Sequence, residues 1–217
     1  MSGRDANSSW AVRVESDASC CEEVARLCSA SFPWSMRWVR WSGYRTRWWR
    51  QAVASEGARM ITVRDAGDSS ILGFCLLVID ELAFRDSMRA VHRSALETVS
   101  AAPYFPLAKA ARARMRRNAQ RLSTPHASRS GEPKDTPRPR AWVELIASHP
   151  ERRGTGMMRS LLDESDRLAR EHGGRCIEAM TDSWNIPAAR MFERNGYEIV
   201  RVTGEKLILS KPLGQPG

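Results

Sequence analysis

The first apolar stripe along the chain has helical spacing and consists of Cys21, Val24, Leu27 and Cys28. It follows Asp17, a residue type that caps helix starts, and it stops at Phe32-Pro33. The stripe therefore predicts a helix that lies on the core. An aromatic segment follows, and its members at helical steps are Trp34, Trp38, Trp41 and Trp48. We interpret this segment either as a packed face under a sheet or as an aromatic wall for a substrate.

The middle of the chain first has strand spacing and then returns to helical spacing. Met60–Arg64 and Ile71–Asp80 predict two strands, and the turn residues 66–69 between them favour an antiparallel hairpin. Residues 84–100 carry an apolar stripe at helical spacing, and an arginine-rich segment at 107–122 predicts a second helix. The proline-rich residues 123–140 have the composition of a flexible linker.

The last third alternates strands and helices. Trp142–Ser148 predicts a strand, which enters the basic turn 149–156 and then a helix that ends at Gly173-Gly174. Arg175–Met180 predicts another strand, a helix starts at Asn185, and the strand pair 197–202 and 206–209 closes the chain. A strand, a turn with glycines and a helix start can bind a phosphate, because free N–H groups and the helix dipole attract an anion there. A purely structural turn would explain the two glycines equally well.

The net charge of +9 is concentrated in one segment. Residues 81–140 hold 13 Lys/Arg against 5 Asp/Glu and thus supply +8 of it, and a dense cluster is formed by Arg112, Arg114, Arg116 and Arg117. The five cysteines lack the paired spacing of a zinc site, so we expect small buried side chains and no metal. The longest apolar run, Ile71–Ile79, is too short to cross a bilayer, and the polar start lacks a secretory signal. We therefore expect a cytoplasmic protein.

Two linked motifs in the last third resemble the signatures of the GNAT N-acetyltransferase superfamily. Arg153-Gly154-Thr155-Gly156-Met157-Met158 is similar to the family's Q/R-x-x-G-x-G/A donor signature. Asn185, Ala188, Phe192 and Glu193, followed by Gly196-Tyr197, resemble the second signature, N-x-x-A-x-x-x-Y/F-E-x-x-G-F. The resemblance covers residues 141–210 well, agrees only in element order before residue 81, and leaves 81–140 without a counterpart.

The resemblance implies an α/β (α+β) fold, with a central mixed, mostly antiparallel sheet flanked by helices. It further implies one GNAT acyltransferase domain over residues 1–217, with 81–140 as an inserted basic helical and linker segment before the fourth strand. The expected activity is acetyl transfer from acetyl-CoA to a primary amine by direct attack. The acceptor is a small-molecule or peptide amine, and an anionic acceptor would suit the basic insertion. The alternative is a nucleic-acid-binding or membrane-surface protein that uses the basic insertion, with or without acyl transfer.

The resemblance also implies where the donor binds. The fourth and fifth strands would splay apart to take the pantetheine arm, and the pyrophosphate would lie on the N–H groups of the loop. The expected donor contacts are Ile146, Ala147, Ser148, Arg153, Gly154, Thr155, Gly156, Met157, Met158, Arg159, Asn185 and Phe192. Met158 replaces the small residue that ends the donor signature. Phe192 stands where many members carry a tyrosine that protonates the leaving thiolate, and phenylalanine has no proton to give.

Proton removal from the amine requires a base. Glu144 is the first candidate, because strand alternation would place it on one face with Trp142, Ile146 and Ser148, and an inward carboxylate in an apolar strand has a raised pKa. Pairing of Glu144 with a nearby arginine is the plain structural alternative. Asp182, just after the fifth strand, is the second candidate.

Overall fold

The computed structural model describes residues 10–32, 42–100 and 140–214. Its strands are β1 (Trp10–Glu15), β2 (Ala58–Asp65), β3 (Ile71–Val78), β4 (Arg140–Ser148), β5 (Cys176–Asp182), β6 (Glu198–Thr203) and β7 (Lys206–Pro212). Its helices are α1 (Cys21–Ser31), α2 (Ser42–Ala54), α3 (Glu81–Ser100), α5 (Met157–Glu171) and α6 (Ile186–Arg194), with short 3-10 turns η1 (Ala18–Cys20) and η4 (Pro150–Arg152).

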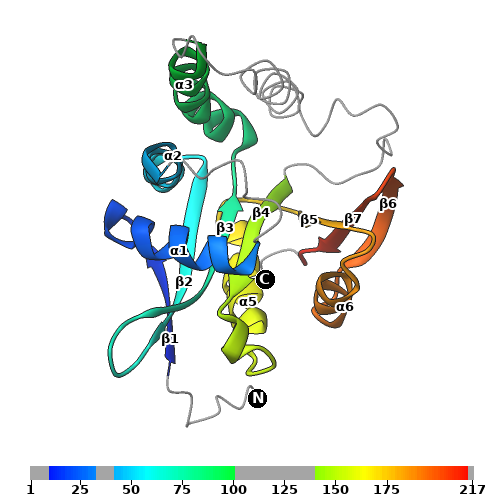
Figure 1. The fold of residues 1–217 in the computed structure, drawn as a ribbon. Coiled ribbons are helices and arrows are strands. Elements are labelled where there is room, and N and C mark those ends of the chain that lie inside the picture. Colours follow the sequence, from blue (N-terminus) through cyan, green and yellow to red (C-terminus); the bar gives the residue numbers. More distant parts are fainter. Residues whose placement is uncertain (1–9, 33–41, 101–139, 215–217) are drawn as a thin grey trace.

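The strands form one seven-stranded sheet in the order β1-β2-β3-β4-β5-β7-β6. All neighbours are antiparallel except β4 and β5, which are parallel. The expected mixed, mostly antiparallel sheet is therefore confirmed, including the hairpin between β2 and β3. Helices α1, α2 and α3 lie on one side of the sheet, and α5 crosses the other side behind β3 and β4 (Figure 1).

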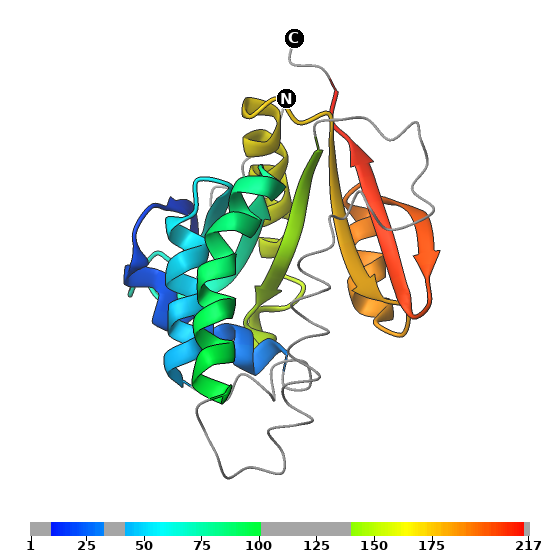
Figure 2. The ribbon, with the colours of Figure 1, turned by 90° about the horizontal axis from the view of Figure 1, so that it is seen from above.

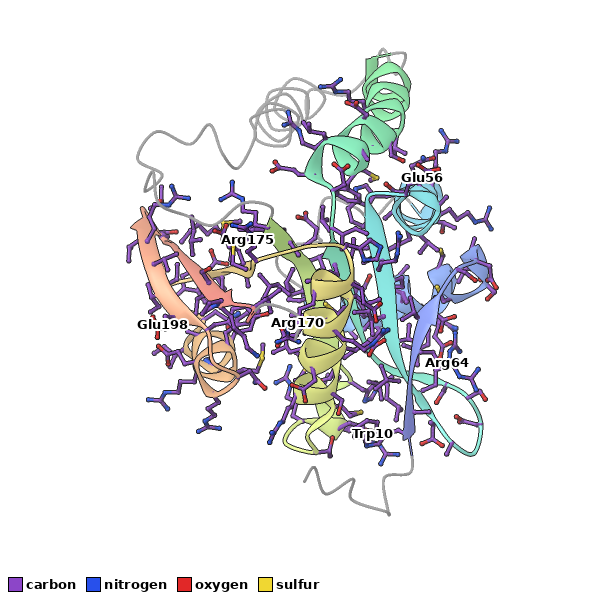
Figure 3. All side chains as sticks on the ribbon, turned by 180° about the vertical axis from the view of Figure 1, so that it is seen from behind. Trp10, Glu56, Arg64, Arg170, Arg175 and Glu198 are labelled. Carbon is purple, nitrogen blue, oxygen red and sulfur yellow. The ribbon has the colours of Figure 1, made fainter. Side chains whose placement is uncertain are left out.

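Two apolar cores occupy the two faces of the sheet. The first core joins α1, α2 and α3 to the sheet through Cys28, Trp49, Met88 and Phe74, and we call this side the α1–α3 face. The second core joins α5 and α6 to the sheet through Leu161, Phe192 and Leu209, and we call this side the α5 face. Figure 3 shows α5, with Arg170 on it, in front of the sheet when the molecule is seen from behind.

The expected first helix is confirmed with its boundaries. Asp17 Oδ1 accepts a hydrogen bond from Ser19 N (2.6 Å), and it caps η1, which leads directly into α1. The helix ends at Ser31, and the N–H of its C-cap, Phe32, donates to Cys28 O. The five cysteines are buried and free, as expected from their apolar surroundings.

The helix expected at residues 84–100 is α3, and it packs on α2. Phe84, Met88 and Val91 are buried, and Gln51 Nε2 on α2 donates to Ser87 Oγ (2.8 Å). On α2, Trp49 is fully buried and lies edge-on to Phe74 of β3, so this part of the aromatic segment is a packed face. Outside the described residues lie Trp34, Trp38, Trp41, the expected helix 107–122 with its arginine cluster, and residues 123–139 of the expected linker. Arg140, the last residue of that linker, is instead the first residue of β4.

Candidate active site

The parallel pairing between β4 and β5 covers only the first part of each strand. It runs from Arg140↔Cys176 to Val143↔Ala179 and then stops. Beyond that point the two strands diverge toward their carboxyl ends (Figure 2). We call the diverging segments, Glu144–Ser148 and Met180–Asp182, the β4–β5 fork. The expected splaying of these strands is confirmed, and it leaves strand edges to which an extended ligand can hydrogen-bond.

Glu144 lies at a bulge where the fork begins. Leu145 pairs with Leu76 of β3 and Val143 pairs with Leu77, so Glu144 is the extra residue between two paired positions. Its side chain is half-buried. Bulges bend a strand, interrupt its pairing and redirect side chains, and they are common beside active sites. This bulge occurs directly after the last residue of β4 that pairs with β5.

The bulge changes which β4 side chains share a face. Trp142, Leu145 and Ala147 pack in the core of the α1–α3 face, whereas Val143 and Ile146 pack in the core of the α5 face. The expectation that Trp142 and Ile146 share a face with Glu144 is therefore wrong, because simple alternation does not count the inserted residue. Ser148 is buried at the end of the strand, and its carbonyl accepts from Ser31 Oγ (3.3 Å).

The loop that follows β4 presents backbone N–H groups at the start of α5. Gly154 and Gly156 both have positive φ values, 80° and 89°, and an added Cβ at either would meet no atom within 4 Å. The first hydrogen bond of α5 that closes a full turn runs from Ser160 N to Gly156 O (3.2 Å). The N–H groups of Met157, Met158 and Arg159 precede that bond, as in every helix start, and they can donate to an anion.

Side chains around this loop add positive charge. The first turn of α5 has no acidic residue. Arg152 Nη2 lies 3.9 Å from Asp65 Oδ2, and Arg159 Nε lies 3.8 Å from Asp163 Oδ2. Arg153 is exposed. Thr155 Oγ1 donates to Arg152 O (2.8 Å) and braces the turn. Because the loop starts one residue after β4 ends, this anion-attracting helix start lies at the open end of the fork.

Met158 and Phe192 both pack against the protein interior. Met158 is partly buried and packs against the core of the α5 face. Phe192 on α6 is 3% exposed, and its ring lies edge-on to Tyr197 at 5.1 Å between centroids. Asn185 is the N-cap of α6, and its side chain accepts from Ala188 N. The cap uses the amide oxygen, so a donor contact by Asn185 would fall to its amide nitrogen.

Tyr197 belongs to a buried polar group between α5 and the sheet. Its hydroxyl is buried and has no hydrogen-bond partner among the described residues. Burial raises the pKa of this phenol, with Asp166 adding to the effect. Asp166 is also buried, its Oδ2 accepts from Lys211 Nζ (2.5 Å), and desolvation raises the pKa of its carboxyl. Lys211 Nζ lies 5.8 Å from the centre of the Tyr197 ring.

The two carboxylates on β5 are both held by cations. Asp182, the second base candidate, accepts from Lys206 Nζ across the β5–β7 pair. Glu178 is buried, and its carboxylate lies 3.3 Å from Arg140 Nη1. Sequence reasoning missed the Arg140–Glu178 pair, because only the register of β4 and β5 brings the two residues together. Its sequence signal was no more than an acidic residue in an apolar strand.

Two further findings concern the described residues alone. No three His, Cys, Asp or Glu side chains in the ranges 10–32, 42–100 and 140–214 gather in a way that could hold a metal ion. Within the same ranges no helix is long and apolar enough to span a membrane.

Comparisons with known proteins agree with this geometry. The model of the acetyltransferase (GNAT) family matches residues 111–197. A protein from Desulfovibrio desulfuricans assigned to the GNAT family is similar in structure, with a TM-score of 0.55, 15% identity, and coverage of 94% of this chain and 99% of its own. The ribosomal-protein-S18-alanine N-acetyltransferase of Escherichia coli gives a TM-score of 0.55 at 10% identity, with 96% of each chain covered.

A third structure was solved with a ligand. The PaiA N-acetyltransferase of Thermoplasma acidophilum in complex with coenzyme A gives a TM-score of 0.52 at 12% identity, covering 93% of this chain and 99% of its own. No curated protein sequence matches the chain. At these identities the structural matches establish the fold, and the family model adds the sequence signature. The chain therefore has the GNAT fold, and its residues 111–197 match the model of the acetyltransferase (GNAT) family.

Proposed function

We propose that this protein transfers an acetyl group from acetyl-CoA to a primary amine, in a single acyltransferase domain that carries residues 81–140 as an insertion. The observation that carries the proposal is the combination of two features. One is the β4–β5 fork, and the other is the start of α5 at its open end, preceded by two glycines with positive φ values. A fork without the loop would be an irregular sheet, and a loop without the fork would be an ordinary anion site. Together they suit an extended ligand that ends in a pyrophosphate.

The loop residues fit that ligand. N–H groups from Gly154 to Arg159 would hold the pyrophosphate, with Arg153 and Thr155 beside it, and both glycines leave open space where a side chain would otherwise stand. Backbone groups of Ile146, Ala147 and Ser148 would pair with the pantetheine arm along the fork. Asn185 and Phe192 would border the arm from the α6 side.

The reaction requires one proton to leave the amine. The amine nitrogen attacks the thioester carbonyl carbon, a C–N bond forms, the C–S bond breaks, and coenzyme A leaves as the thiolate. Glu144 would accept the amine proton, directly or through a water molecule. Its place at the bulge, where the fork begins, supports this role over that of Asp182, whose carboxylate is held by Lys206.

The leaving thiolate needs no strong acid at this site. Phe192 offers no proton, and the hydroxyl of Tyr197 is buried with a raised pKa, which makes it a poor proton donor. We therefore propose that the thiolate leaves unprotonated and takes its proton from solvent. The five free cysteines suit a reducing compartment, which supports a cytoplasmic location.

A direct experiment tests donor use and acyl transfer separately. Acetyl-CoA should raise the melting temperature, because a ligand that binds only the folded state stabilises it. Thiol release, followed with a chromogenic thiol reagent, should depend on both acetyl-CoA and an added primary amine. A matched tertiary amine, which cannot form an amide, is the control. Thiol release at the same rate with both amines would contradict amine acylation.

A further inference from the structure

Arg201 on the edge strand β6 shares a row with the start of the fork. Arg201 pairs with Ile208 of β7, and Ile208 pairs with Met180 of β5. Directly opposed residues of neighbouring strands have their side chains on the same face. Ile208 and Met180 pack in the core of the α1–α3 face, so Arg201 lies on that face too. Met180 is the first residue of β5 beyond its pairing with β4, and Arg201 therefore faces the start of the fork.

Two guanidinium nitrogens of Arg201 are buried, although the side chain as a whole is half-buried. Its Nε and Nη1 atoms are both inaccessible to solvent and find no acceptor among the described residues. The other residues of β6 are all exposed, so the burial is particular to this side chain. Because β6 is the outermost strand, as Figure 3 shows at its labelled residue Glu198, burial on it indicates a side chain that lies back over the sheet. A buried donor without an acceptor is costly, and in native proteins it calls for a specific explanation.

The two β5 carboxylates on this face are already bound by other cations. One row further along, Asp182 accepts from Lys206. One row back, Glu178 is paired with Arg140. The Arg201 guanidinium is therefore a fixed positive charge that the two β5 carboxylates do not neutralise. A partly desolvated guanidinium favours a planar carboxylate or a phosphate, which it can bind through two parallel hydrogen bonds.

We infer that Arg201 binds an anionic group of the acceptor, so the acceptor is a small amine that also carries a carboxylate or a phosphate. This inference rests on the proposed function, because it uses the fork as the place where the amine reacts. Two strand spacings separate β5 from β6, which is about 10 Å. A side chain that lies back over β7 shortens that distance. One small molecule can therefore present its amine at the fork and its anion to Arg201.

Matched pairs of amines test the inference. The probes are O-phosphoethanolamine against ethanolamine, and L-leucine against 3-methylbutylamine, so that each pair differs only by the anionic group. Binding to the protein saturated with coenzyme A is measured by calorimetry, and KM and kcat are measured by thiol release from acetyl-CoA. The variants are Arg201→Met, Arg201→Lys and, as the matched control, Arg194→Met at the exposed end of α6.

The anionic member of at least one pair should bind more tightly than its neutral partner. Arg201→Met should weaken that binding by about 10- to 100-fold and raise KM alike while retaining kcat, as expected for a charged hydrogen bond used in binding. Arg201→Lys should retain part of the preference, and Arg194→Met should retain all of it. The pair that responds distinguishes a phosphate from a carboxylate.

Two results would overturn the inference: neither anionic amine binds better than its neutral partner, or Arg201→Met leaves the preference unchanged. Amine-dependent thiol release without an anionic preference would leave the proposed function standing and remove only the inference. Arg201-dependent binding without any thiol release would do the reverse. Should Arg201→Met fail to fold, Arg201→Lys and the wild-type preference still decide the question.

Discussion

Two glycines at opposite ends of α5 allow the donor loop to be tested against its own structural control. Gly156 precedes the helix with φ 89°, and Gly173 follows it with φ 75°. An added Cβ would meet no atom within 4 Å at either position, so valine would be strained at both and would clash at neither. Each valine should cost about 1–3 kcal/mol of unfolding free energy, which lowers the melting temperature by roughly 2–12 °C in a chain of this size.

The two variants should differ only in their response to the donor. At an acetyl-CoA concentration of about 100 Kd, binding stabilises the folded state by about 2.7 kcal/mol and should raise the melting temperature by roughly 5–11 °C. Gly173→Val should keep that rise. Gly156→Val should lose most of it, because the side chain enters the space that the pyrophosphate would occupy at the helix start. Differential scanning fluorimetry across a range of acetyl-CoA concentrations measures both effects at once. An equal rise in the two variants would refute the assignment of the loop.

Four further predictions concern single side chains. Glu144→Gln should lower kcat by about 10²- to 10⁴-fold while leaving the acetyl-CoA thermal shift intact, and full activity would move the role of base elsewhere. Asp182→Asn should lose the ion pair with Lys206 and some stability but little turnover, so a large loss of kcat would identify Asp182 as the base instead. Tyr197→Phe should stabilise the protein by about 1–3 kcal/mol in urea unfolding, because it removes a buried hydroxyl that has no partner among the described residues. A fall in kcat would instead show that Tyr197 donates the proton. Burial raises the pKa of Asp166, so the folded state binds its proton more tightly than the unfolded state and stability falls as pH rises above 3.8 through the raised value. Asp166→Asn removes this pH dependence. The unfolding free energy of the variant relative to that of the wild type should therefore increase between pH 4 and pH 7.

The last third of the chain was predictable because its signals are local. A turn with two glycines before a helix, an Asn cap at residue 185 and a glycine after α6 all mark element ends without reference to the rest of the protein. The strand expected at Trp142–Ser148 is β4, and the helix expected to end at Gly173-Gly174 is α5, which ends at Glu171. The fork could be expected only through the resemblance, since pairing that stops part-way along a strand has no local signature.

Strand β1 shows a limit of prediction from the local sequence pattern. Trp10–Glu15 alternates apolar and polar residues weakly, and Val14 remains 40% exposed. Its place in the sheet depends on pairing with β2 along its whole length, from Trp10↔Asp65 to Glu15↔Met60. An edge strand buries little, so its sequence carries little of the alternation that identifies a central strand. Pairing with β2, which is distant in the sequence, therefore determines the position of this strand in the sheet.

The same limit applies to the candidate site, because the sequence does not show which cations lie beside its carboxylates. Three carboxylates on β4 and β5 were available near the fork: Glu144, Glu178 and Asp182. Register gives Glu178 to Arg140 and Asp182 to Lys206, and neither cation is close to its carboxylate in the sequence. The bulge then puts Glu144 between two paired residues at the exact level where β4 leaves β5. Simple alternation along β4 also proposed Glu144, but it did not count the bulge, so the side chains that it placed on one face with Glu144 were wrong. Long-range pairing therefore decides which cations lie beside Glu178 and Asp182, and a comparison of Glu144→Gln with Asp182→Asn tests the proposal that Glu144 is the base.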